Sequence, residues 1–187
     1  MTYNESEIEE LVAGEAPRDL IIKMQRSPKD DDRFEKYLKI LQRRVQWKER
    51  ILLPIGEHLY IVEKENEDRV VKCDCSHEFG DYRENWKLEA LIYVRDTENK
   101  LEEIYPGPRK PDPELCEVRE YSCPECGRLL EVEAVPPGYP PIFHFLPDID
   151  EFYAKWLKTP LASSQNGKWF RDLTLEKVNR WMRQAKD

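Results

Sequence analysis

The sequence predicts an α+β fold: helices at the N-terminus, an antiparallel β core with a four-cysteine site, and helices at the C-terminus. Two observations predict it. The hydrophobic period changes from helical to strand-like near residue 50, and two cysteine pairs follow predicted strands. The 187 residues suffice for one domain of ordinary size with appendages. We expect a helical region at 1–50, an antiparallel β domain with the cysteine site at 51–147, and C-terminal helices at 148–187, with a basic tail from residue 162.

Residues 4–46 have the pattern of three short helices. A first apolar stripe ends at Gly14, and Pro17 then stands where the start of a helix tolerates proline. Acidic residues at 30–32 favour the positive end of a third helix dipole. The apolar face of this third helix consists of Phe34, Leu38, Leu41 and Val45.

After residue 50 the pattern is that of short strands joined by turns. Two apolar runs flank Gly56, and a polar turn at 63–68 precedes a third run. This spacing is typical of an antiparallel meander. The predicted strands are 51–55, 58–62, 70–71, 88–94, 118–122 and 129–135.

Proline-dense connections lie at 106–113 and 136–141. Such chain is stiff and extended and lacks a backbone donor at each proline, which suits a path over another protein's surface as well as over its own. Asp148 then stands as the N-cap of a helix that Pro160 ends.

The tail consists of a polar linker at 162–168 and an amphipathic, basic helix at 170–184. We expect this helix to dock on a partner or on the body of the chain, because an isolated helix of this length is marginal in water. The alternative is a frayed tail with an incidental apolar face. The side chains expected to dock are Leu175, Val178, Trp181 and Met182.

Four of the five cysteines form two close pairs. Cys73 and Cys75 follow one predicted strand, and after 47 intervening residues Cys123 and Cys126 follow another, with Gly127 behind them. A Cys-x-x-Cys-Gly turn places two thiolates on one side of a tight loop, and two such turns make a tetrahedral, zinc-ribbon-like site. The first turn is tighter, with one residue between its cysteines. We expect these four cysteines to bind a structural zinc ion; the alternatives are a redox dithiol and unligated core cysteines.

The free energies favour a structural metal. Closing the 47-residue loop costs about 3.4 kcal/mol plus a constant. Zinc held by thiolates contributes on the order of 10 kcal/mol or more at neutral pH. Four sulfur ligands leave no position for water, so such a site is structural and not hydrolytic.

The remaining chemistry-bearing residues identify no catalytic group. His77 could replace a thiolate, although an outer hydrogen bond or exposure is favoured, and Cys116 is expected to be an unligated, half-buried thiol. His58 and His144 lie in apolar sequence contexts, which favours packing in a core or an interface. There is no GxxxxGK phosphate loop, and acidic pairs are too abundant to single out an acid/base couple. We expect neither catalytic nor cofactor-binding residues on this chain.

The distribution of charge argues against nucleic acid as a partner. Residues 51–105 carry 7 basic and 14 acidic side chains, whereas a nucleic-acid binder presents a basic surface to phosphates. The apolar runs are too short to span a membrane, and the first residues, MTYNESE, lack a signal peptide's basic start. We therefore expect a cytoplasmic protein, in which the cysteines stay reduced.

Several longer stretches of the sequence resemble those of a known protein family. They are CDCSHEFGDYRENWKL at 73–88, RDT at 95–97, EEIYP at 102–106, REYSCPECG at 119–127 and PDIDEFY at 147–153. With 34–42 and 51–62, they make the chain from about residue 27 to 157 closely resemble the gamma subunit of acetone carboxylase. Ser76 departs from the family's usual glycine after the second cysteine, which strains that turn slightly.

The resemblance implies a non-catalytic, zinc-bearing small subunit of an ATP-dependent ketone carboxylase. Such a subunit would join two large subunits, alpha and beta, in a dimer of heterotrimers that converts acetone and bicarbonate to acetoacetate. The large subunits would carry the ATP and manganese sites, and Cys73, Cys75, Cys123 and Cys126 would be the zinc ligands here. The ketone stays open, because related complexes act on acetophenone.

Two alternative hypotheses assign the chain to other functional classes. One is a free-standing zinc-ribbon module that binds nucleic acid or protein, against which the acid excess argues where nucleic acid is concerned. The other is an enzyme in its own right, with an open zinc position through His77.

Overall fold

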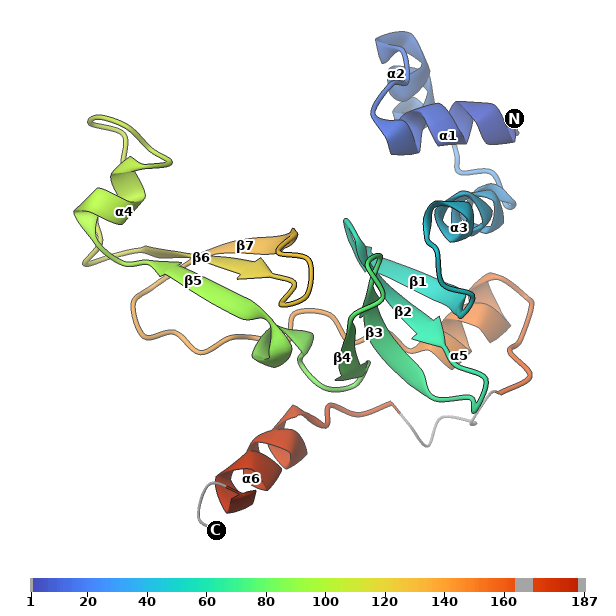
Figure 1. Ribbon diagram of the computed structural model, residues 1–187. Helices are drawn as coiled ribbons and strands as arrows, with labels where there is room; N and C mark the ends of the chain where they lie inside the picture. Colours follow the sequence, from blue (N-terminus) through green and yellow to red (C-terminus); the bar gives the residue numbers. More distant parts are fainter. Residues whose placement is uncertain (1, 164–169, 185–187) are drawn as a thin grey trace.

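Two antiparallel sheets form the body of the chain, with helices α1 to α3 beyond one of them and helix α6 beneath (Figure 1). The computed structural model describes residues 2–163 and 170–184. Within these residues, no helix combines the length and the apolar character that a membrane span requires. The predicted α+β class is confirmed.

The three N-terminal helices are α1 Glu5–Ala13, α2 Arg18–Arg26 and α3 Arg33–Arg44. Asn4 begins α1 with a reciprocal cap, in which its side chain accepts from the amide of Glu7 (2.9 Å) and Glu7 accepts from the amide of Asn4 (2.8 Å). Tyr3, Ile8, Met24 and Ile40 form a small core of their own between these helices. The prediction of three helices is confirmed.

The first sheet contains β1 Arg50–Gly56, β2 Leu59–Glu63, β3 Arg69–Cys73 and β4 Glu78–Asp81, paired in that order. Alternation along the strands divides its side chains between two faces. One face packs under Leu41 of α3 and consists of Ile51, Tyr60, Val62 and Val70. The other faces the principal core with Leu52, Leu59, Ile61 and Val71. Strand β4 was not predicted.

The second sheet contains β5 Leu91–Arg95, β6 Glu117–Ser122 and β7 Leu129–Val135, with β6 in the middle. The predicted strand at 88–94 begins later than expected, because a 3-10 helix, η1 Trp86–Glu89, occupies the residues before it. Asn85 caps that helix by accepting from the amide of Lys87 (3.2 Å). A short unpredicted helix, α4 Glu98–Glu102, follows β5.

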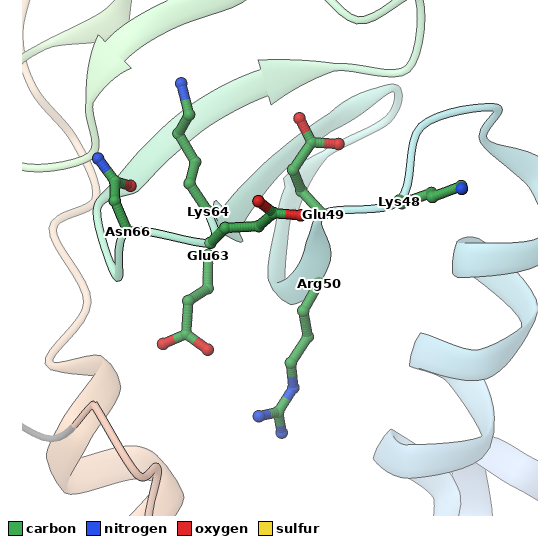
Figure 2. A pocket seen from close by; sticks show the side chains of 7 residues that line it. Lys48, Glu49, Arg50, Glu63, Lys64 and Asn66 are labelled. Carbon is green, nitrogen blue, oxygen red and sulfur yellow. The ribbon is translucent and has the colours of Figure 1, made fainter.

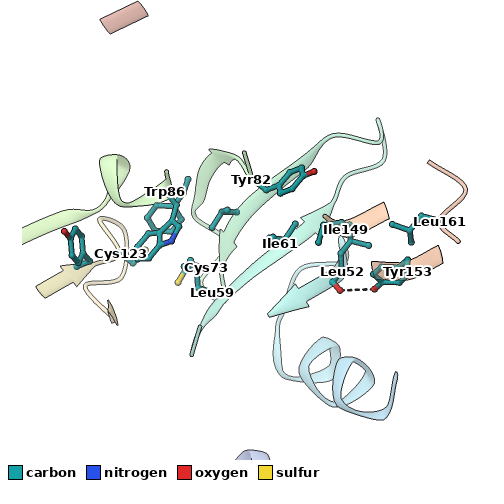
Figure 3. Close-up of a cluster of buried hydrophobic side chains, with 13 residues drawn as sticks. Leu52, Leu59, Ile61, Cys73, Tyr82, Trp86, Cys123, Ile149, Tyr153 and Leu161 are labelled. Atoms are coloured by element: carbon teal, nitrogen blue, oxygen red, sulfur yellow. Dashed lines mark hydrogen bonds between the residues drawn. The ribbon is translucent and has the colours of Figure 1, made fainter. Parts of the chain in front are cut away.

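The principal core joins the two sheets and contains two of the predicted metal ligands (Figure 3). The Trp86 ring packs edge-on between Phe79 of β4 and Tyr121 of β6, with ring centroids 5.7 and 6.2 Å away. Cys73 and Cys123 are fully buried in this core. The sheets therefore meet where the cysteine pairs lie.

The C-terminal segment packs back onto the first sheet. Asp148 caps α5 Ile149–Glu151 as predicted, accepting from the amide of Glu151 (3.0 Å), and the helix continues as a π-helical turn, η2 Phe152–Trp156. The hydroxyl of Tyr153 donates to the carbonyl of Leu52 (2.9 Å), drawn in Figure 3. Of the predicted linker at 162–168, residues 164–168 lie outside the described residues.

Helix α6 Thr174–Gln184 confirms the predicted tail helix, but the predicted docking face is wrong for the body of the chain. The helix contacts the body through Lys177, which is buried and pairs with Glu84 (3.0 Å) and Glu89 (2.7 Å). Leu175 and Met182 are 71% and 56% exposed. Of the four predicted docking side chains, Leu175 and Met182 thus face solvent, Trp181 is 38% exposed and Val178 is half-buried.

Candidate metal centre

Four sulfur atoms meet at the junction of the two sheets. Cys73 is the last residue of β3, and Cys123 follows the last residue of β6. The sulfur atoms of Cys73, Cys75, Cys123 and Cys126 all lie within 4.8 Å of one another. A tetrahedral zinc ion with Zn–S bonds of about 2.3 Å requires sulfur atoms about 3.8 Å apart. The observed separations of 3.9 Å (Cys73 to Cys126) and 3.6 Å (Cys75 to Cys123) fit that ion.

Both cysteine turns are closed by the same pair of backbone hydrogen bonds. The amide of Cys73 donates to the carbonyl of His77, and the amide of Ser76 donates back to Cys73 (2.9 and 3.0 Å). In the second turn the amide of Cys123 donates to Arg128, and the amide of Gly127 donates to Cys123 (both 2.9 Å). The first turn therefore has the same design with one residue fewer.

The residue after each second cysteine has a left-handed backbone. Gly127 has φ +69°, which glycine adopts without a steric penalty, whereas Ser76 has φ +85°, which is unfavourable for a residue with a Cβ atom. The strain expected from serine at this position is therefore present in the structure.

Backbone amides point at three of the sulfur atoms. Those of Cys75, His77 and Arg128 donate to the sulfurs of Cys73, Cys75 and Cys126, respectively. Burial nevertheless raises the pKa of the Cys73 and Cys75 thiols, since the apolar core disfavours a thiolate. A cation is the group that would keep these sulfurs deprotonated there.

A carboxylate that sequence reasoning missed ties the two turns together. Asp74 lies between the first two cysteines; its carboxylate is 2.8 Å from Nδ1 of His58 and forms an ion pair with Arg128 of the second turn. His58 is partly exposed and pairs with a carboxylate, so of the predicted core or interface packing the core placement is wrong, and the interface stays a prediction. The signal that could have indicated this bridge is the opposite charge of Asp74, between the first two cysteines, and Arg128, two residues after Cys126.

The side chains of the other two residues considered as ligands are not part of the cluster. The ring of His77 packs edge-on against Phe79, with centroids 4.8 Å apart, and His77 is not among the clustered ligands. The Cys116 sulfur contacts the carbonyl of Glu117 (3.7 Å) and is also outside the cluster.

A second cluster, also missed from the sequence, contains Glu131, Glu133 and His144. The ammonium group of Lys87, which is buried, occupies its centre and lies 2.7 Å from Glu131 and 3.1 Å from Nδ1 of His144, with an ion pair to Glu133. The Lys87 ammonium group therefore occupies the position that a metal ion would need in this cluster. The predicted core placement of His144 is likewise wrong, because its side chain is half-exposed beside Glu131 and Glu133, and its predicted interface packing stays a prediction.

A surface pocket of about 530 Å³ lies where β1 begins and β2 ends, and it is lined by charged side chains (Figure 2). The labelled side chains fan outward and do not converge on one point, and Glu49 forms an ion pair with Lys72. The pocket therefore lacks the converging polar groups of an active site.

Comparison with known proteins finds one matching family model and two similar proteins. The model of the family described as acetone carboxylase gamma subunit matches residues 45–157. The acetone carboxylase gamma subunit of Xanthobacter autotrophicus is 47% identical over 162 residues, which cover 86% of this chain and 96% of that protein. The acetophenone carboxylase beta subunit of Aromatoleum aromaticum is 30% identical over 97 residues, which cover 51% of this chain and 74% of that protein.

Proposed function

Since the chain belongs to the acetone carboxylase gamma subunit family, we propose that it is the non-catalytic, zinc-bearing small subunit of an ATP-dependent ketone carboxylase. The complex would contain two large subunits, alpha and beta, in a dimer of heterotrimers. The small subunit would hold the assembly together, and the large ones would convert acetone and bicarbonate to acetoacetate.

The closed set of four sulfur atoms carries this proposal. Four sulfurs at these separations complete a tetrahedral shell, so a zinc ion bound there would fix the sheets and would offer no coordination position to water or substrate. Cys73 and Cys75 would hold it from the first sheet, and Cys123 and Cys126 from the second. Asp74 and Arg128 would keep the two turns in register around it.

Other features of the chain support a non-catalytic role. Lys87 neutralises the second acidic cluster, and the sequence contains no phosphate-binding loop of the GxxxxGK type. The ATP and manganese sites would therefore lie on the large subunits. Acetone is the ketone we propose, because the identity to the acetone carboxylase subunit is higher and covers more of both chains than that to the acetophenone carboxylase subunit.

Reconstitution of the complex tests the proposal. The purified chain alone should show no ketone-dependent ATP hydrolysis, and the large subunits expressed without it should be inactive or unstable. Adding the zinc-loaded chain back should restore acetoacetate formation. Ketone-dependent ATP hydrolysis by the chain alone would contradict the proposal, and so would full activity of the large subunits without it.

Native mass analysis separates the proposal from its rivals. We expect the chain to co-purify with two large subunits in a complex whose mass is that of a dimer of heterotrimers. A bound oligonucleotide would indicate a nucleic-acid-binding zinc ribbon, and a lone active chain would indicate an enzyme in its own right.

A further inference from the structure

One face of the second sheet presents four large apolar side chains to solvent. Leu91 and Leu129 lie on either side of Ser122, and Tyr93 and Val132 lie on either side of Glu120. Residues directly opposite each other in an antiparallel sheet point to the same side, so these four side chains form two adjacent rows. Their exposed fractions are 56% (Leu91), 49% (Leu129), 45% (Tyr93) and 51% (Val132). We call these four side chains the open face.

Other parts of the second sheet are partly covered by the chain itself. At the far end of β5, Arg95 donates to the carbonyl of Lys100 (2.9 Å) and so ties α4 to that strand. On the opposite side of the sheet, Tyr121 and Glu133 are buried beneath Lys87. Ile92, on that opposite side, is 41% exposed, so the open face differs from it in gathering four exposed apolar side chains in two adjacent rows.

The open face carries no unpaired charge at its centre. Glu120, the charged residue between Tyr93 and Val132, is held by Arg95 at 2.9 Å. The Arg95 guanidinium also lies over the Tyr93 ring, 4.9 Å from its centroid. A partner that covers these rows would therefore meet apolar side chains with one neutralised ion pair between them, and a matching partner surface is itself largely apolar.

The area of the open face indicates the kind of partner. Four half-exposed side chains present on the order of 350 Å² of apolar surface, as large as patches that are often functional on monomers. Two copies meeting through it would bury only about 700 Å² in total, below the roughly 1,200 Å² of a stable interface. A larger protein could extend its contact onto the neighbouring surface and reach that area.

We propose that the open face binds an apolar surface of a large carboxylase subunit, an inference that rests on the function proposed above. The row formed by Leu91, Ser122 and Leu129 leads directly to Cys123. A large subunit seated there therefore lies against the strand end that supplies the second cysteine turn. A zinc ion bound by the four cysteines would stiffen this docking surface by anchoring the end of β6.

The test uses the full chain, with Leu91→Asp and Val132→Asp made on the two edge strands. Each charge lies on a half-exposed position, so the thermal melt and metal content of the isolated chain should match those of the wild type. The matched control is Leu115→Asp, since Leu115 is 74% exposed and lies outside the sheets. Affinity for the purified large subunits is measured by titration and by co-elution.

We expect both sheet variants to bind the large subunits at least tenfold more weakly than Leu115→Asp, which should bind like the wild type. Binding of both variants within twofold of the control would overturn the inference while leaving the proposed function intact. A dimer of the isolated chain that Leu91→Asp disperses would overturn it as well, because the occupant would be a second copy. Failure of the wild type to bind would instead refute the proposed function, and this inference with it.

Discussion

The sulfur atoms of Cys73 and Cys126 lie 3.9 Å apart, although 53 positions separate the two residues along the chain. Cys73 ends a strand of the first sheet, and Cys126 lies in the turn between two strands of the second. The sheets share no strand, so this contact and that of Cys75 with Cys123 close the junction between them.

Replacing one sulfur should open that junction. We expect Cys126→Ser to lose the bound zinc and to lower the free energy of unfolding by at least about 3 kcal/mol, the order of the loop-closure term. Elemental analysis and thermal melts measure both effects. Cys116→Ser is the control and should keep one zinc per chain, because its sulfur lies outside the cluster. Full zinc retention in Cys126→Ser would show that the four sulfurs are not the ligands.

The two cysteine turns differ in strain, and reciprocal substitutions measure it. Ser76→Gly should raise the free energy of unfolding by about 0.5–1 kcal/mol, because glycine removes the penalty at φ +85°. Gly127→Ala should lower it by about 1–2 kcal/mol, although a Cβ atom there would meet nothing within 4 Å. Thermal unfolding of the metal-loaded variants tests both signs. Destabilisation by Ser76→Gly would mean that the serine side chain stabilises the turn.

The cluster of Glu131, Glu133 and His144 around Lys87 should make the free energy of unfolding depend on pH. Burial alone would raise the pKa of Glu133, but Lys87 and the Tyr121 hydroxyl outweigh it, and the pKa is lowered. The resulting stabilisation is complete above the unfolded pKa near 4.5 and is lost as the pH falls through the lower folded pKa. Chemical denaturation at pH 7 and at stepwise lower pH measures this loss.

We expect Glu133→Gln to cost about 1–3 kcal/mol at pH 7 and to flatten the pH profile below about 4.5, since the neutral amide cannot titrate. Glu151→Gln serves as the control, because its pair with Lys155 is exposed, and it should change stability by less than about 0.5 kcal/mol. A profile of Glu133→Gln parallel to that of the wild type would assign the acid sensitivity to other carboxylates.

The attachment of α6 should depend on its one buried cation. Lys177→Ala removes the ion pairs to Glu84 and Glu89, so amide exchange across residues 174–184 should accelerate at least about tenfold, the effect of a 1.4 kcal/mol loss. Leu175→Ala, at a largely exposed position of the same helix, should leave the exchange of the isolated chain nearly unchanged. The reverse order of the two effects would mean that the apolar side holds the helix.

What the sequence predicts well here is local. The cysteine turns follow from spacing within four residues and a glycine, and the first sheet follows from apolar alternation along consecutive strands. Strand β4 was missed because its residues, EFGD, contain Phe79 as their one large apolar side chain. Its place is set by pairing with β3, a relationship that its own composition does not carry.

Polar contacts between residues far apart in the sequence explain the other features that the sequence did not predict. The apolar stripe of α6 indicates which side chains favour burial, but Lys177 meets Glu84 and Glu89 more than 80 positions away, and those pairs set the orientation. Asp74 and Arg128 likewise meet only once the two sheets are in place. Such partners carry no periodic signal in either segment.

The division of the four sulfurs between two sheets also sets an order of events during synthesis. Cys73 and Cys75 leave the ribosome about 50 residues before Cys123 and Cys126. At roughly 5–20 residues per second, the first pair waits between about 2 and 10 s for the second. Throughout that interval the nascent chain carries two exposed thiols without their counterparts, and any metal delivered early would find only half of its ligands.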